Sequence, residues 1–370
     1  MFGRNFFNLD WWLAGAIGGL LVFGLLLIYF LAIGSEQTYL FQRQLIFSIL
    51  GIVFWLLFSF LDYRLWRNYA WLLYIVGLFL LLLVFVLGQS GKGALSWFHL
   101  GFFNLQPVEF MKLALIIFLA KYFSDLPRGT ITVRDLIISG GYVLGPVLLT
   151  VLQPDMGSAL VLLAIWLGMV ILAGLNGRQF VALILLSFLL VGLSWSFVLR
   201  DYQKRRVISF FNPQTDILGS GYNVIQATIA IGSGGLTGKG LGKGSQSQLH
   251  FVPERHTDFI FATLGEETGL MGVGILLSLF GLILFRLQQI GKRARDYFGR
   301  LLIGGIISLL FFHIFINIGM NLGLVPVMGI SLPFISYGGS FLLIVMMLLG
   351  VAQSVWLRRK EQQEKAIDIF

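Results

Sequence analysis

Residues 253–261 bring four ionisable side chains together directly before a long apolar run. The segment reads Pro-Glu-Arg-His-Thr-Asp-Phe-Ile-Phe, and its ionisable members are Glu254, Arg255, His256 and Asp258. A charged side chain at the edge of a hydrocarbon layer is costly and usually serves a function. A carboxylate there could take a proton from a substrate, and a guanidinium could bind a phosphate. We therefore predict that the chemistry of this chain takes place at this segment.

Two further acids lie just after prolines at places where apolar runs begin. Glu109 lies two residues after Pro107, and Asp155 follows Pro154 directly. Each has a structural explanation, because Asp caps helix N-termini, acids in the first turn oppose the helix dipole and Pro favours that turn. Their expected location on the same membrane face as Asp258 favours a functional explanation. Both explanations stay open.

Lys112 is a basic residue slightly inside an apolar run, three positions after Glu109. Residues at this spacing share one helix face, so the two side chains can form an ion pair. A pair that faces the interior of a helix bundle is tolerated where a lone lysine would be expensive. The pair is either purely structural, or Lys112 is a positive group in a cavity for an anionic headgroup; both interpretations stay open.

A glycine-rich stretch at 232–244 carries Lys239 and Lys243. It does not match the Walker nucleotide loop, because Gly240 follows Lys239 where that loop needs Ser or Thr. The stretch is either a mobile surface loop or a set of backbone amides that, with the two lysines, could cradle a diphosphate.

The sequence gives no sign of a transition-metal site. The chain has no cysteine, and its four histidines, His99, His250, His256 and His313, are scattered. No His-Glu-x-x-His pattern occurs, so we expect no dedicated metal centre. A loosely held Mg²⁺ or Mn²⁺ on carboxylates and substrate phosphates stays open as a cofactor.

The composition is that of an all-α polytopic membrane protein. Hydrophobic residues make up 57% of the 370 residues and charged residues only 12%, whereas about a quarter of a soluble domain is charged. Apolar runs long enough to cross the hydrocarbon layer recur along the chain and predict about ten transmembrane helices. These are 11–33, 45–61, 69–87, 107–123, 135–152, 157–174, 180–199, 259–287, 301–322 and 334–356.

Basic residues predict the orientation of these helices. The net charge of +9 does not indicate nucleic acid, because the Lys and Arg residues lie mostly in short loops between the apolar runs. In a model with ten spans, most of them fall on one side, which is then cytoplasmic together with both termini. The long connection at 200–258 falls on the outer side, as a large extracytoplasmic loop between the seventh and eighth spans.

Five motifs spread over essentially the whole chain resemble one known family. They are Gln-Pro-Val-Glu-Phe-Met-Lys at 106–112, Gln-Pro-Asp-Met-Gly-Ser at 153–158, Ser-Gln-Ser-Gln at 245–248, the segment 253–261, and Ser-Tyr-Gly-Gly-Ser at 336–340. These resemble the SEDS proteins (shape, elongation, division and sporulation), which are peptidoglycan glycosyltransferases of the bacterial inner membrane. Arg255 makes the chain more similar to the elongation members than to the division members.

The resemblance implies a single membrane domain over 1–370 with ten transmembrane helices. It implies that Asp258 is the catalytic aspartate, that Asp155 is a second essential acid, and that Glu109 and Lys112 form an ion pair in the substrate cavity. Arg43 resembles a further family arginine. The chain departs from the family at Ser96, where an arginine is common.

The implied reaction is the inverting polymerisation of lipid II into glycan strands, with release of undecaprenyl diphosphate. Asp258 would take the proton from the acceptor sugar hydroxyl, and cations would stabilise the departing diphosphate. Candidate cations are Arg43, Lys112, Arg205, Arg206, Lys239 and Arg255. The resemblance also implies a class B penicillin-binding protein, a transpeptidase, as partner, with membrane lipids around both.

Two other functions compete with this hypothesis. Many helices with buried charges also describe a flippase or transporter for lipid-linked precursors, although the sequence shows no internal repeat and its acids gather on one face. A scaffold that only recruits a transpeptidase is the third candidate.

Overall fold

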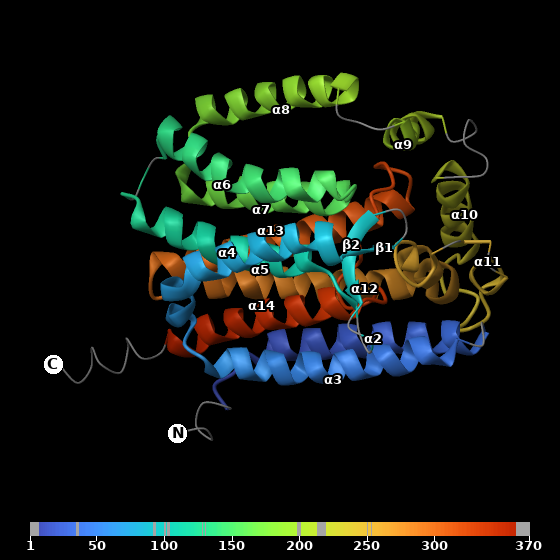
Figure 1. The fold of residues 1–370 in the computed structure, drawn as a ribbon. Helices are drawn as coiled ribbons and strands as arrows, with labels where there is room; N and C mark the ends of the chain where they lie inside the picture. Colours follow the sequence, from blue (N-terminus) through green and yellow to red (C-terminus); the bar gives the residue numbers. More distant parts are fainter. Residues whose placement is uncertain are drawn as a thin grey trace.

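A computed structural model describes residues 7–359, apart from 35–36, 92–93, 100, 102–103, 128, 130, 198–200, 213–219, 250 and 253. Most of these residues are helical (Figure 1). The first half of the chain forms α2 (Trp11–Gly34), α3 (Thr38–Phe60), α4 (Tyr63–Leu87), β1 (Gln89–Gly91), β2 (Ala94–His99), β3 (Asn104–Leu105), α5 (Pro107–Asp125), α6 (Val133–Leu152) and α7 (Met156–Gly174). The second half forms α8 (Gly177–Phe197), α9 (Asp201–Phe211), α10 (Ser220–Ser233), α11 (Ser245–Gln248), α12 (Ile260–Lys292), α13 (Tyr297–Asn321) and α14 (Gly339–Arg358).

The structure confirms a polytopic helical membrane protein. Among the described residues, eight helices are long and apolar enough to cross a membrane, namely α2, α3, α4, α6, α7, α12, α13 and α14. The predicted span 107–123 lies in α5, and the described part of the predicted span 180–199 lies in α8. A count of ten transmembrane helices stays a prediction. Several helices extend beyond the predicted runs; α3 begins at Thr38 and α4 at Tyr63, because their first turns contain polar residues that hydropathy leaves out.

Helix α5 lies in the middle of the bundle and is buried over most of its surface. A helix that is surrounded in this way needs apolar residues on all faces, which makes its two buried charges, Glu109 and Lys112, exceptional. The outer helices instead expose large apolar side chains, such as Phe79 at 60% and Ile137 at 70%. An exposed apolar surface of this extent fits a hydrocarbon environment.

The two ends of the bundle differ. Helix α2 begins and α14 ends at one end, whereas β1, β2, α10 and α11 lie at the other (Figure 1). An ion pair between Asp10, just before α2, and Arg286 of α12 ties the first end together. The strands, which the sequence did not predict, form a small antiparallel sheet in the order β1-β2-β3. Ser96 lies buried in β2.

The connection predicted at 200–258 contains regular structure. The described part forms the helices α9, α10 and α11. Helix α8 lies at the edge of the bundle beyond α6 and α7, and α9 follows it at the end where α10 and α11 lie (Figure 1). That this connection lies outside the cell stays a prediction.

Helix α12 is broken at Gly269, which has a φ of 64° and a ψ of −164° that only glycine adopts readily. The glycine-rich stretch passes along this break and supplies the hydrogen bonds that the helix loses. The amides of Lys239 and Gly240 donate to the carbonyls of residues 266 and 267, and the amides of residues 270 and 271 donate to the carbonyls of 235 and 236. The stretch is therefore hydrogen-bonded to α12. This argues against a mobile surface loop, and it leaves the amides of Lys239 and Gly240 already bound, so these two cannot cradle a diphosphate.

Candidate active site

The turn before α12 presents Asp258. Its main-chain carbonyl accepts hydrogen bonds from the side-chain amides of Asn317 and Asn321 on α13, both at 3.0 Å. Asn321 also accepts from the amide of Ala262 in the first turn of α12, at 3.0 Å. The Asp258 carboxylate is partly exposed and lies beside Gly329, where an added Cβ would be 3.6 Å from Oδ2. The main chain of Asp258 is thus held in place, while the residue as a whole stays partly exposed.

The segment between α13 and α14 holds the same turn from a second side. The Ser336 hydroxyl donates to the Thr257 carbonyl at 2.7 Å, and the Tyr337 amide donates to the His256 carbonyl at 2.7 Å. Three consecutive carbonyls, of residues 256 to 258, are therefore fixed by two separate elements. Such support limits the movement of a reactive side chain, which is what a preorganised site requires.

Arg43 on α3 lies next to this turn through Tyr337. Its guanidinium is hydrogen-bonded to the Tyr337 phenol and lies 5.8 Å from the centre of the Tyr39 ring. Burial raises the pKa of the Tyr337 phenol, while Arg43 acts in the opposite direction. Because the amide of Tyr337 binds the carbonyl of His256, a partly exposed cation stands close to the segment that carries Asp258.

Glu109 and Lys112 form the ion pair that their spacing predicts. Lys112 Nζ lies 2.8 Å from Glu109 Oε1, and both side chains are almost fully buried. Lys112 Nζ also lies 3.5 Å from Nε2 of His313 on α13, whose Nδ1 lies 3.0 Å from the Ser331 carbonyl. A carbonyl can only accept, so we assign the proton of His313 to Nδ1, and Nε2 then accepts from Lys112.

This buried pair is connected to both proposed catalytic acids. His313 lies one helical turn before Asn317, whose side chain binds the Asp258 carbonyl. On the other side, Asp155 caps α7 by accepting from the amide of Ser158 at 3.0 Å. Its second oxygen accepts from the side chain of Gln106, the residue directly before α5, at 3.0 Å. The structure therefore brings Asp155, Glu109 and Lys112 into one connected set of contacts that reaches the Asp258 turn.

The remaining predicted cations have other surroundings. Lys239 forms an ion pair with Glu266 of α12 at 2.8 Å. Arg255 is buried, and its guanidinium donates to the carbonyls of Ser247 and Gln248 in α11. Arg206 is exposed on α9, which packs against α10. The side chain of Arg205 lies outside the described residues.

Comparison with known proteins identifies the family. The FtsW/RodA/SpoVE family, described as "Cell cycle protein", matches residues 4–361. The peptidoglycan glycosyltransferase MrdB of Escherichia coli K12 is 38% identical over 342 residues, which cover 92% of this chain and 91% of MrdB. Stage V sporulation protein E of Bacillus subtilis is 39% identical over 325 residues, which cover 87% and 88%. This chain belongs to the FtsW/RodA/SpoVE family. The resemblance seen in the motifs is thereby confirmed.

Solved structures support the same assignment. A chain from the study "Structural coordination of polymerization and crosslinking by a peptidoglycan synthase complex" matches with a TM-score of 0.82 and 35% identity, over 95% of this chain and 98% of that one. The crystal structure of the Thermus thermophilus rod shape determining protein RodA matches with a TM-score of 0.70 and 31% identity, over 95% and 97%. The fold of this family member is therefore that of RodA.

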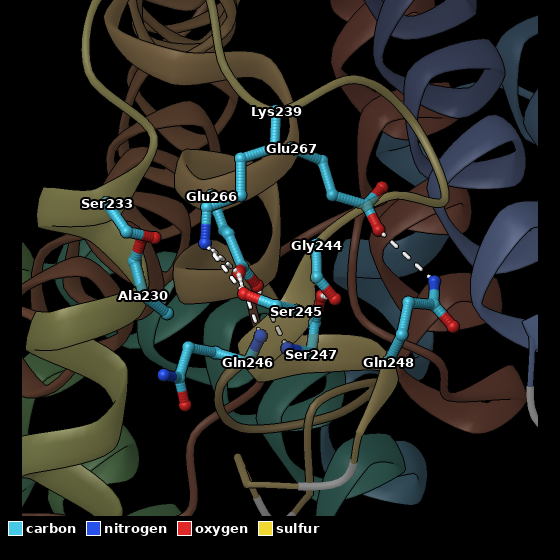
Figure 2. A network of polar contacts seen from close by, with 10 residues as sticks. All are labelled: Ala230, Ser233, Lys239, Gly244, Ser245, Gln246, Ser247, Gln248, Glu266 and Glu267. Carbon is cyan, nitrogen blue, oxygen red and sulfur yellow. Dashed lines mark hydrogen bonds and ion pairs between the residues drawn. The ribbon is translucent and has the colours of Figure 1, made fainter.

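Sequence reasoning overlooked three buried groups of this family member. Glu266 and Glu267 lie side by side in α12 and are almost completely buried, and Glu266 is the centre of a polar network (Figure 2). The sequence does contain a sign of Glu266 and Glu267, because two adjacent acids inside the predicted span 259–287 are as exceptional as Lys112. His313 was noted only as a scattered histidine, because its partner Lys112 is 201 residues away in sequence.

The described residues hold no group of three or more His, Asp or Glu placed to bind one metal ion.

Proposed function

We propose that this chain polymerises lipid II into glycan strands, with Asp258 as the general base. Its family and the names of its relatives make it a peptidoglycan glycosyltransferase. The transport alternative is not favoured, since relatives across the family carry that enzyme name. The observation that carries the residue assignment is the turn of Asp258: two separate elements hold its main chain, and the residue is partly exposed.

In the proposed step, Asp258 removes the proton from the acceptor sugar hydroxyl as its oxygen attacks the anomeric carbon of the donor sugar. The new carbon–oxygen bond forms while the bond from that carbon to the diphosphate breaks, so the anomeric centre inverts and undecaprenyl diphosphate leaves. One carboxylate is enough, because a diphosphate leaves without a strong acid, unlike the leaving group in glycoside hydrolysis. Nearby cations stabilise the charge that develops on the diphosphate.

Arg43 is the cation that the geometry favours for the diphosphate. It is partly exposed, its position is fixed by Tyr337, and a guanidinium can bind two phosphate oxygens at once. Lys112 is buried against Glu109 and would act as a fixed positive group at the base of the site. Arg206, Lys239 and Arg255 remain proposed partners, among which Arg206 is the exposed one.

Asp155 has a proposed supporting role as the second acid. It binds both the first turn of α7 and the side chain of Gln106 beside α5. It would thereby keep the helix that carries Glu109 and Lys112 in register with the rest of the site.

We place the enzyme in the bacterial inner membrane, with both termini in the cytoplasm and Asp258 facing outward. The argument is the bias of Lys and Arg, which gather at the end where α2 begins and α14 ends, for example Arg286, Arg293 and Arg358. A class B penicillin-binding protein is the proposed partner. It is supported by the similarity to a chain from a peptidoglycan synthase complex that polymerises and crosslinks.

The test is Asp258→Asn in purified protein supplied with lipid II. The variant keeps the shape of the side chain but cannot accept the proton, so we expect a folded protein that forms no glycan polymer. Asp125→Asn, an exposed acid at the end of α5, is the control and should polymerise normally. Polymer formation by Asp258→Asn would remove Asp258 from the mechanism. Movement of lipid II between leaflets without polymer in the unmodified protein would favour a flippase, and neither activity would favour a scaffold.

A further inference from the structure

The Glu266 side chain is a buried anion that collects donors from a distant part of the chain. It is fully buried in α12, and its Oε1 accepts from Lys239 Nζ and from the amide of Gln246, both at 2.8 Å. Its Oε2 accepts from the amide of Ser247 at 2.9 Å. Figure 2 shows Lys239 on one side of Glu266 and Gln246 and Ser247 on the other. Both oxygens are therefore used, and two of the donors are main-chain amides.

These amides belong to α11, the single turn formed by the Ser-Gln-Ser-Gln motif. The free amides at the start of a helix carry partial positive charge, so a carboxylate placed there fixes the position of the turn. The carbonyl of Glu266 also accepts from the amide of Lys239 at 3.0 Å. Residue 266 thus holds the segment 239–247 through both its main chain and its side chain.

The same turn holds Arg255 through its carbonyls. The Arg255 guanidinium donates to Ser247 O and to Gln248 O. The Arg255 carbonyl in turn accepts from the hydroxyl of Thr263 on α12 at 3.4 Å. Arg255 lies only three residues before Asp258, in the same turn. A continuous series of contacts therefore runs from Glu266 through α11 and Arg255 to the turn that presents Asp258, and the Thr263 bond connects Arg255 back to α12.

The neighbouring Glu267 lacks these contacts to α11. It is equally buried, and it interacts with the main chain of Gly242 and with the charge of Arg255. Its Oε1 also accepts from the Gln248 side chain at 3.3 Å, but neither of its oxygens binds a main-chain amide of α11. The two acids therefore share residue type, burial and helix, and differ in whether they fix the backbone of α11. This makes Glu267 a matched control for Glu266.

We propose that Glu266 is a positioning residue for glycan polymerisation: it fixes α11, which holds Arg255 and thereby the turn that carries Asp258. The proposal rests on the role of Asp258 proposed above. In this proposal Glu266 acts through α11 and does not itself bind lipid II, so its loss should change the orientation of the base more than the affinity for lipid II. Misplacement of a reactive group lowers the turnover number far more than it lowers binding.

The experiment compares Glu266→Gln with Glu267→Gln in the purified full chain, with lipid II as substrate. A Gln side chain has one acceptor oxygen and cannot bind the amides of Gln246 and Ser247 with both of its terminal atoms. We expect kcat to fall about 10- to 100-fold in Glu266→Gln, with KM for lipid II unchanged within about twofold. Glu267→Gln should lower kcat clearly less than Glu266→Gln does, because it leaves the amides of Gln246 and Ser247 bound to Glu266.

Hydrogen exchange tells a positioning role from general damage. Peptides that cover 244–258 should exchange faster in Glu266→Gln, whereas those from α5 and α13 should be unchanged. Equal kcat values for the two variants, or an unchanged exchange rate at 244–258, would overturn the proposal. If Glu266→Gln does not fold, Glu266→Asp provides the measurement, because it keeps the charge on a shorter side chain. Full kcat in a folded Glu266→Asp protein whose 244–258 peptides exchange faster would overturn the proposal as well.

The two proposals fail separately. An inactive Asp258→Asn together with a fully active Glu266→Gln would leave the proposed function standing and refute the positioning role. An active Asp258→Asn would refute the base assignment whatever the Glu266 variants do.

Discussion

At the scale of single residues, the Glu109–Lys112 pair places two charges inside the bundle. Removing both charges from water is expensive, and their mutual attraction at 2.8 Å offsets that cost only while both are present. The second oxygen of Glu109 is buried without a hydrogen-bond partner. A buried acceptor without a hydrogen bond lowers stability. The Glu109–Lys112 pair is therefore not explained by stability alone, which favours a role for the pair in the site.

We predict that Glu109→Gln destabilises the protein by about 3–5 kcal/mol, because Lys112 is left charged and buried without its partner. The measurement is the thermal unfolding midpoint in detergent. Asp125→Asn is the control, since it breaks the exposed Arg67–Asp125 pair and should change stability by at most about 1 kcal/mol. Equal shifts of the unfolding midpoint in Glu109→Gln and Asp125→Asn would contradict the prediction.

Residue types predicted part of the candidate site. Glu109 and Lys112 were identified because charges in an apolar run are exceptional, and their pairing followed from the spacing on one helix face. The partners of Asp258 could not be paired from the sequence, because Asn317 lies 59 residues away on another helix. Glu266 lies in an equally apolar run, but its partners Gln246 and Ser247 belong to a separate turn about 20 residues earlier, which helix spacing does not reveal.

At the scale of elements, the break in α12 is the place where the glycine-rich stretch attaches to the helix. Gly269 adopts a backbone conformation that side chains rarely tolerate, and an added Cβ would lie 2.3 Å from the amide nitrogen of Gly238. Gly238 in turn approaches the carbonyl of Glu267, where its own added Cβ would be 2.2 Å away. Glycines on both sides are thus required for the loop to fasten to the broken helix.

We predict that Gly269→Ala destabilises the protein by about 1–3 kcal/mol, through the strained conformation together with the steric clash. Gly274→Ala in the same helix is the control, because nothing lies within 4 Å of its added Cβ. It should be neutral or stabilising by up to about 1 kcal/mol. The thermal midpoints of the two variants provide the comparison, and the prediction is wrong if Gly269→Ala unfolds no earlier than Gly274→Ala.

Hydropathy predicted the long helices because a helix in lipid must present apolar side chains over its whole length. It could not predict α9, α10 and α11, which are shorter and more polar and depend on contacts with distant segments. Helix α11 has four residues and is held by an acid about 20 positions later in the chain. The strands β1 to β3 were missed for the same reason, because pairing of short segments depends on tertiary context.

At the scale of the whole molecule, the proposed orientation has a direct test because the native chain has no cysteine. Single cysteines can therefore be introduced without removing others. Leu236→Cys and Leu249→Cys lie at the end with α10 and α11 and are exposed at 68% and 66%. Arg295→Cys, in the connection between α12 and α13, lies at the end where α14 finishes and is also exposed.

We predict that a membrane-impermeant maleimide labels Leu236→Cys and Leu249→Cys in intact spheroplasts and labels Arg295→Cys only after the membrane is opened. The physical reason is the excess of Lys and Arg around residue 295, which keeps that end in the cytoplasm. Labelling of opened membranes confirms that all three cysteines are reactive. The reverse pattern would place Asp258 on the cytoplasmic side and exclude a reaction on outward-facing lipid II.

The tautomer of His313 has a consequence for an enzyme that works in an energised membrane. A row of titratable groups inside a helix bundle could conduct protons and dissipate the ion gradient. Here the contacts that start at Glu109 pass through Lys112 to Nε2 of His313, and the proton on Nδ1 points to the Ser331 carbonyl. A main-chain carbonyl cannot take up and release a proton at neutral pH. With this tautomer, the row of titratable groups that begins at Glu109 ends at His313, because the next group along it, the Ser331 carbonyl, cannot titrate.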